Sequence, residues 1–129
     1  MAEAVLDASA VLAFLRGEPG EDVVRRLLPR SLLSTVNLTE IIGKLVERGL
    51  SGPEAVRLAR ELPYEVVSFD AELAASAGSL WARTRGSGLS LGDRACLALA
   101  GREKLPAVTT DRRWSAEDTG VRVQQIRPD

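Results

Sequence analysis

The sequence contains no histidine and a single cysteine, Cys96, among its 129 residues. The absence of histidine excludes Ser-His-Asp and Cys-His nucleophile systems, imidazole acid–base pairs and histidine metal ligands. One cysteine cannot form an intrachain disulfide or a zinc site built from several thiolates, and it fits a reducing, cytoplasmic location. Any chemistry of this protein is therefore expected to rest on carboxylates, hydroxyls, amides and basic side chains.

Long hydrophobic runs and an excess of charge of one sign are also missing. The longest apolar stretch, residues 4–15, is interrupted by Asp7 and is too short for a membrane span, and no basic segment precedes it as in a signal peptide. The 17 Lys and Arg residues balance 18 Asp and Glu residues, and 45% of the chain is hydrophobic. This composition is typical of a globular protein without a membrane segment, and the length fits one domain over residues 1–129.

Short apolar segments alternate with helical patterns along the chain. The sequence predicts strands at 4–6, 32–34, 66–67, 107–110 and 121–126, with helices at 11–15, 21–28, 35–48, 52–62, 71–85 and 91–102 between them. Short apolar strands separated by helices need cover on both faces of a sheet. The predicted class is therefore α/β, a three-layer α/β/α sandwich with a central, mainly parallel sheet.

Four helix starts carry capping signals. Thr35 is expected to cap the helix at 35–48, and Asp70 the helix at 71–85. Glutamate or aspartate stands three residues after a serine at two further starts, which predicts the capping boxes Ser51–Glu54 and Ser90–Asp93. In the 71–85 helix we expect one shared face, formed by Leu73, Ala77, Leu80, Trp81 and Thr84.

Four acidic residues are predicted to converge at one edge of the sheet. Asp7 and Asp111 each follow a strand, and Glu40 and Asp93 lie early in helices that start at the same edge. Carboxylates this close repel one another unless a cation joins them, and oxygen ligands without histidine favour Mg²⁺ or Mn²⁺. Taken singly, each acid also fits an ordinary cap, turn or solvated helix face.

Four segments of the chain resemble the PIN-domain ribonucleases, and most closely the toxins of VapBC-type toxin–antitoxin modules. These segments are residues 5–11 (VLDASAV), 34–40 (STVNLTE), 89–98 (LSLGDRACLA) and 108–114 (VTTDRRW), of which the third is the most specific. The resemblance covers nearly the whole chain. It implies a PIN-like fold and an Mg²⁺- or Mn²⁺-dependent endoribonuclease that hydrolyses RNA phosphodiester bonds.

The resemblance also assigns roles to individual residues. It maps a catalytic, metal-binding cluster onto Asp7, Glu40, Asp93 and Asp111. Ser9 and Thr110 match positions whose hydroxyls orient the carboxylates of the cluster without binding the metal themselves. Asp118 loosely matches a further, more distant acid.

Partners follow from the same resemblance. It implies an RNA substrate and a small VapB-like antitoxin, whose flexible C-terminal segment would lie between the helices after the first two strands and place a basic side chain against the four acids. We expect neither a pro-segment nor an inhibitory tail on this chain, so inhibition is expected to come from that partner. A homodimer is also implied. The leucine-rich helices at 35–62 offer an interface, unless Leu38, Leu50 and Leu58 simply complete the monomer core.

The charge of the chain and the other protein classes that we considered leave one alternative to a nuclease. The net charge of −1 is unusual for a nucleic-acid binder, but residues 71–113 hold seven basic and four acidic residues, which favours a local phosphate-binding surface. A phosphoacceptor receiver domain fits poorly because Asp7 is followed by Ala8 rather than by a second acid. Cys96, set among small apolar residues, is interpreted as a core residue rather than a nucleophile. The alternative is a catalytically silent binding or scaffold module with the same fold.

Overall fold

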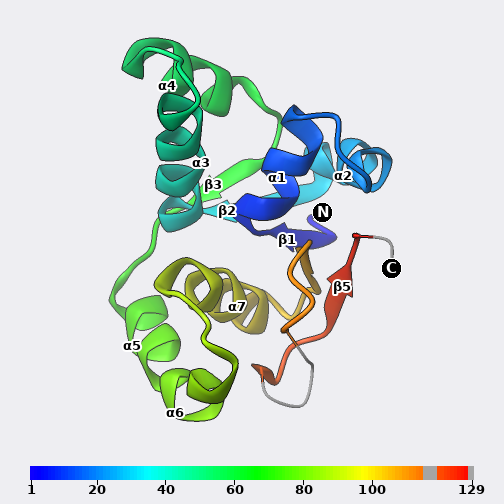
Figure 1. Ribbon diagram of the computed structural model, residues 1–129. Helices are drawn as coiled ribbons and strands as arrows, with labels where there is room; N and C mark the ends of the chain where they lie inside the picture. The colour runs from blue at the N-terminus through cyan, green and yellow to red at the C-terminus, as the bar shows by residue number, and fades with distance from the viewer. Residues whose placement is uncertain (115–118, 128–129) are drawn as a thin grey trace.

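Five short strands form one parallel sheet in the order β3-β2-β1-β4-β5 (Figure 1). The computed structural model describes residues 1–114 and 119–127. The strands are β1 (Ala4–Leu6), β2 (Ser31–Ser34), β3 (Glu65–Val67), β4 (Ala107–Thr109) and β5 (Val123–Gln125). The predicted parallel α/β arrangement is confirmed, although the last two strands are shorter than expected.

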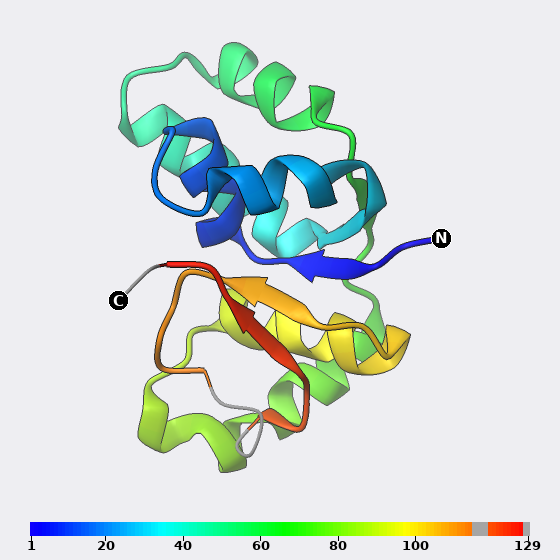
Figure 2. The same ribbon diagram turned by 90° about the vertical axis from the view of Figure 1, so that its right-hand side faces the viewer.

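Helices cover both faces of the sheet and complete the three-layer sandwich (Figure 2). One layer contains α1 (Ala8–Leu15), α2 (Glu21–Leu27), α3 (Thr35–Glu47), α4 (Gly52–Glu61) and the 3-10 turn η1 (Leu28–Arg30). The other layer contains α5 (Ala71–Ser79), α6 (Trp81–Thr84), the turn η2 (Arg85–Ser87) and α7 (Leu91–Glu103). No helix in the described ranges is long and apolar enough to cross a membrane.

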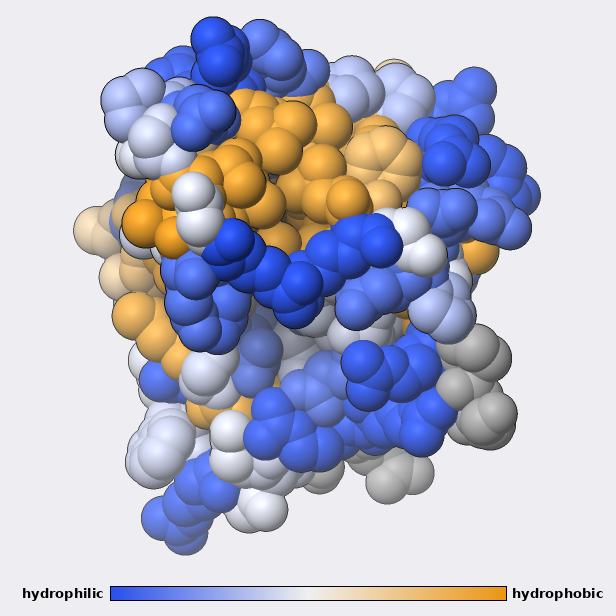
Figure 3. Space-filling model, turned by 45° about the horizontal axis from the view of Figure 1, so that its top comes forward, coloured by the Kyte–Doolittle hydropathy of each residue, from blue (hydrophilic) through white to orange (hydrophobic). Residues whose placement is uncertain are grey.

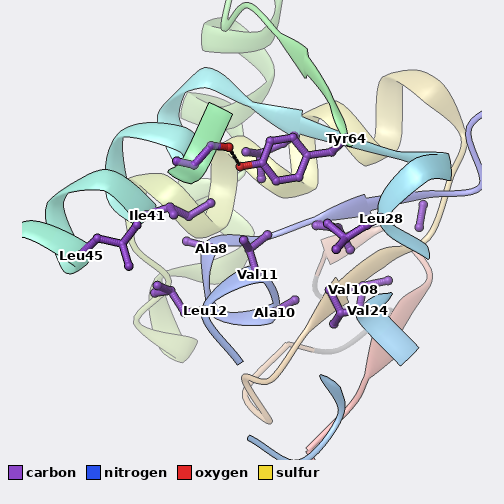
Figure 4. Close-up of a cluster of buried hydrophobic side chains, with 14 of the residues drawn as sticks. Ala8, Ala10, Val11, Leu12, Val24, Leu28, Ile41, Leu45, Tyr64 and Val108 are labelled. Atoms are coloured by element: carbon purple, nitrogen blue, oxygen red, sulfur yellow. Dashed lines mark hydrogen bonds between the residues drawn. The ribbon is translucent and has the colours of Figure 1, made fainter. Parts of the chain in front are cut away.

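The alternation of side chains along each strand divides the core into two clusters. Leu6 and Val108 point into the layer of α1 to α4, whereas Val5 and Ala107 point toward α5 and α7. In the first cluster the hydroxyl of Tyr64 donates to the carbonyl of Ala59, and burial raises its pKa to about 12 (Figure 4). The three leucines considered for a dimer interface pack against this same cluster: Leu38, Leu50 and Leu58.

The order of the strands places a crevice next to β1. The chain runs outward from β1 to β2 and β3, then crosses back so that β4 pairs with the other side of β1. At such a switch point the connections that follow the two neighbouring strands leave on opposite sides of the sheet. In open parallel sheets, ligands bind in the resulting crevice, outside the carboxyl ends of the strands. Asp7 follows β1 and Asp111 lies just after β4, so both belong to this crevice.

Three of the four predicted helix caps are confirmed. Ser51 with Glu54 and Ser90 with Asp93 form complete capping boxes, and the Asp70 carboxylate accepts from the backbone N–H of Leu73. The prediction for Thr35 is wrong, because Ser34 has the extended backbone of a cap and its hydroxyl accepts from the N–H of Val36. Helix α3 therefore begins at Thr35 itself.

The single helix expected at 71–85 is interrupted. Helix α5 ends at Ser79, and α6 starts a new short turn at Trp81. Gly78 and Ser79 are weak helix formers, which explains the break at this point. Trp81 consequently leaves the face it was predicted to share with Leu73 and Ala77, and 53% of its surface is exposed.

Candidate active site

The four predicted acids line one pocket at the carboxyl edge of the sheet. Asp7, Glu40, Asp93 and Asp111 surround a cavity of about 190 Å³, with Ala8, Ser9, Leu12 and Lys44 completing its wall. The acids come from four separate parts of the chain: the ends of β1 and β4 and the early turns of α3 and α7. The structure therefore brings them together, while their catalytic and metal-binding roles stay predictions.

Asp7 is the most deeply buried of the four acids. It caps α1: its Oδ1 accepts from the N–H of Ala10 at 2.9 Å and from the hydroxyl of Ser9 at 2.7 Å. Burial nevertheless raises the pKa of Asp7 to about 6, against the effect of its hydrogen bonds and with a smaller contribution from the charge of Asp93. A carboxylate this desolvated would be stabilised by a cation in the pocket.

A threonine hydroxyl holds the other oxygen of Asp7, but it belongs to Thr109 rather than to the predicted Thr110. Thr109 Oγ1 donates to Asp7 Oδ2 at 2.8 Å and accepts from the N–H of Asp111 at 2.9 Å. The register explains the correction: Leu6 pairs with Val108, so the next residues along the two strands, Asp7 and Thr109, lie side by side. Thr110 instead contributes its backbone N–H, which donates to Ser9 Oγ at 3.1 Å.

Glu40 belongs to α3, and its side chain extends toward Gly92 at the start of α7. Its Oε1 accepts from the side-chain amide of Asn37 at 2.9 Å, and the same amide donates to the carbonyl of Gly92 at 3.0 Å. Partial burial raises the pKa of Glu40, and the nearby charge of Asp93 raises it further, whereas Asn37 and Lys44 lower it. The sequence analysis did not identify Asn37 or Gly92 as site residues.

Asp93 is held by the start of its own helix. Its Oδ2 accepts from the N–H of Ser90 at 2.9 Å, and the Ser90 hydroxyl accepts from the N–H of Asp93 at 3.2 Å. The carboxylate thus lies in the first turn of α7, where the helix dipole favours a negative charge. This position is compatible with both the capping role and the metal-binding role considered from the sequence.

Asp111 is paired with Arg113, a residue that the sequence analysis counted only as part of a basic surface. The Asp111 carboxylate accepts from the Arg113 guanidinium at 2.6 to 3.1 Å, and its Oδ1 also accepts from the Arg113 N–H at 2.8 Å. These hydrogen bonds hold the pKa of Asp111 below its ordinary value. The one available signal was the spacing, since an arginine two residues after an acid in a turn can reach back to it.

The donor chemistry of the pocket fits a hard divalent cation. Its four acids offer only oxygen ligands, and among the described residues no basic side chain donates a hydrogen bond to the buried Asp7. Within residues 1–114 and 119–127, however, no three acidic or cysteine side chains are arranged so that they could hold an ion as they stand. Each carboxylate accepts hydrogen bonds from donors of its own, and a metal bound by Asp111 would compete with Arg113 for the same oxygens. Asp118, the loosely matched fifth acid, lies outside the described residues.

Cys96 lies behind this site and takes no part in it. It is fully buried in the cluster of α5 and α7. Burial and the charges of Asp7, Asp93 and Glu40 keep the pKa of its thiol well above the ordinary value. A thiol held in this neutral form is a small core residue, as the sequence indicated.

Comparisons with known proteins identify the family and the fold. A family model described as the PIN domain matches residues 4–118. The fold is similar to that of a DNA-bound VapBC from Salmonella typhimurium, with 20% identity, 97% of this chain and 98% of that chain covered, and a TM-score of 0.74. It is also similar to VapBC2 from Rickettsia felis bound to a promoter DNA fragment (15% identity, 95% and 97% covered, TM-score 0.72) and to FitAcB from Neisseria gonorrhoeae (22%, 93% and 95%, 0.69). No curated protein matches the sequence.

Proposed function

Because this chain belongs to the PIN domain family, we propose that it is an Mg²⁺- or Mn²⁺-dependent endoribonuclease that acts as the toxin of a type II toxin–antitoxin pair. The observation that carries the proposal is the convergence of Asp7, Glu40, Asp93 and Asp111 on one pocket beside β1 and β4. Without histidine, hydrolysis of RNA phosphodiester bonds needs another source of activation. A cluster of carboxylates that holds a divalent metal provides it.

Each part of the pocket has a role in this reaction. Asp7, Glu40, Asp93 and Asp111 would hold the metal, which supplies an activated water and stabilises charge on the phosphoryl oxygens. The hydroxyls of Ser9 and Thr109 donate to different oxygens of Asp7 and so fix the plane of its carboxylate. Lys44 brings a positive charge to the wall of the pocket, where it offsets the repulsion between the acids and an incoming phosphate.

A basic side chain at the pocket rim supports an RNA substrate. The Arg113 guanidinium lies 3.7 Å from Asp93, so it is within reach of a phosphate that approaches the acids. Arg94 follows Asp93 in α7, and its guanidinium lies over the exposed ring of Trp81, 5.4 Å from the ring centre. Phosphate contacts supply much of the affinity of proteins for nucleic acids, and an exposed aromatic ring offers a surface on which a base can stack.

The second part of the proposal is a VapB-like antitoxin. A broad apolar area bordered by hydrophilic residues faces the viewer in Figure 3. Helices α1, α3 and α4 carry half-buried apolar residues in this layer, and Val46 and Val56 are 44% and 40% exposed. The similar structures include VapBC and a toxin–antitoxin complex from Klebsiella pneumoniae. An apolar segment of the partner that packs on these helices could place a basic side chain against the four acids.

Two further parts of the proposal concern assembly and location. We propose that the protein forms a homodimer and that it acts in the cytoplasm.

The decisive test is cleavage of RNA by the purified chain. We expect cleavage in Mg²⁺ or Mn²⁺ that stops when EDTA removes the metal. If no RNA is cut with either ion, the alternative of a catalytically silent scaffold with this fold is favoured. Co-expression with the protein encoded directly upstream tests the partner: a partner that neither co-purifies nor relieves growth inhibition contradicts the toxin role, even if the nuclease activity is found.

A further inference from the structure

Asn37 links the two helices that carry Glu40 and Asp93. It is 1% exposed and lies in the first turn of α3. Its side-chain Nδ2 donates both to Glu40 Oε1, on the same helix, and to the carbonyl of Gly92, 55 residues further along in α7. One amide group therefore fixes the carboxylate of Glu40 relative to the start of the neighbouring helix.

The orientation of this amide is determined by its neighbours. Both contacts of Nδ2 are acceptors, so a flipped amide would place its own oxygen against a carboxylate and a carbonyl. In the orientation found, Oδ1 is buried without a hydrogen-bond partner among the described residues. An unfulfilled buried acceptor reduces stability. Packing alone therefore explains Asn37 poorly.

Gly92 makes room for the same carboxylate. A Cβ atom placed on Gly92 would overlap both oxygens of Glu40, far inside van der Waals contact. Gly92 is the second residue of α7 and does not have a left-handed backbone, so its backbone conformation alone does not require glycine. The carboxylate of Glu40 rests on the bare backbone of α7, one residue before Asp93.

We propose that Asn37 and Gly92 are positioning residues of the acidic site: together they fix Glu40 against the first turn of α7, beside Asp93, where it can share a divalent metal with the other acids. This inference rests on the proposed nuclease function, since it names the residues that set the geometry of its metal site. Residues behind a metal ligand that orient it commonly affect metal affinity by about 10-fold to 100-fold.

The first experiment compares two glycine substitutions in metal binding. Gly92→Ala should weaken Mn²⁺ binding by about 10-fold or more, because the new methyl group displaces the Glu40 carboxylate. The control is Gly43→Ala in α3, where a Cβ meets nothing within 4 Å. Electron paramagnetic resonance of free Mn²⁺ gives the affinities, and thermal unfolding in EDTA shows that both variants fold. Equal affinity in the two variants would overturn the proposal.

A compensating substitution separates positioning from general damage. Aspartate is shorter than glutamate by one carbon–carbon bond, about 1.5 Å, so Glu40→Asp withdraws the carboxylate from the space that the methyl group added by Gly92→Ala would fill. We expect Gly92→Ala combined with Glu40→Asp to bind Mn²⁺ more tightly than the two single losses predict. Glu40→Asp combined with Gly43→Ala should show no such coupling. Additive losses in the first pair contradict direct contact between Gly92 and Glu40.

Asn37 is tested with a variant of similar volume and with a spectroscopic signal. Asn37→Leu retains the packing but removes the donor, and we expect Mn²⁺ affinity to fall while the protein remains folded. In NMR spectra of the metal-free proteins, the side-chain amide signals of Asn37 should differ from those of wild type in Gly92→Ala and match them in Gly43→Ala. Failure of the proposed function looks different: wild type would then neither bind Mn²⁺ nor cut RNA. Failure of the positioning role alone would leave Mn²⁺ binding and RNA cleavage unchanged in Gly92→Ala and in Asn37→Leu.

Discussion

The guanidinium of Arg113 lies 2.6 Å from the carboxylate of Asp111, Nη2 to Oδ2. The same guanidinium donates to the carbonyls of Ser87 and Gly88 and lies 3.7 Å from Asp93. Arg113 thus joins the turn before α7 to two of the four acids. In the metal-free protein it offsets part of the repulsion that these acids exert on one another.

The first prediction concerns competition between Arg113 and the metal. Arg113→Ala should tighten Mn²⁺ binding by about twofold to fivefold, the range expected when a half-exposed ion pair of ~0.5–1 kcal/mol no longer has to be broken. Arg85→Ala is the matched control, because Arg85 is an exposed arginine of the neighbouring η2 turn. Titration of Mn²⁺ at fixed ionic strength measures the effect. Weaker binding in Arg113→Ala would show instead that the arginine helps to build the site.

The second prediction concerns Asp93, which the structure places both in the acidic pocket and in the capping box of α7. Asp93→Asn should abolish RNA cleavage because a metal ligand is lost. Removal of one repelling charge stabilises the metal-free fold, but the carboxylate also caps α7 and meets its dipole, and these contributions oppose each other. We therefore expect the free energy of unfolding in EDTA to change by less than about 1 kcal/mol. Cleavage at the parent rate would refute the assigned role.

The third prediction is a pH dependence of stability that originates at Asp7. Its pKa is about 6 in the folded protein, against an ordinary value of 3.8, so the folded state holds the proton more tightly than the unfolded state. The metal-free fold should consequently lose stability as the pH rises from about 4 to 6 and change little above that, with a total loss of at most about 3 kcal/mol. Urea unfolding in EDTA across this range should show the decline in wild type and a flatter profile in Asp7→Asn. A decline of equal size in that variant would place its origin elsewhere.

The sequence predicted those features that depend on local patterns. The parallel sheet, the two capping boxes and the convergence of the four acids follow from apolar periodicity and from the edge that strand ends and helix starts share. The contacts of Asn37 with Gly92 and of Arg113 with Ser87 join residues far apart in the chain, and no local pattern encodes them. The break at Leu80 depends on a balance between weak helix formers and tertiary packing, which propensity alone does not resolve.

The two consecutive threonines before Asp111 show the same limit at the scale of one residue. Successive side chains of a strand point in opposite directions, so only one of the two can face Asp7. The pairing of β4 with β1 decides which one, because it sets Thr109 beside Asp7. A prediction made without the register had no basis for choosing Thr109 over Thr110.

The last prediction tests that choice by comparing two isosteric substitutions. Thr109→Val removes the hydroxyl that donates to Asp7 and accepts from the N–H of Asp111, so two buried polar groups lose a partner. At pH 7 in EDTA it should lower the free energy of unfolding by about 1–3 kcal/mol, and the pKa of Asp7 should rise further. Thr110→Val keeps the backbone N–H that donates to Ser9, and its effect should stay within about 0.5 kcal/mol. Urea unfolding of both variants at pH 7 and pH 4 measures the difference, which should shrink at pH 4 because Asp7 is then protonated. A larger loss in Thr110→Val than in Thr109→Val would reverse the assignment and return the hydroxyl role to Thr110.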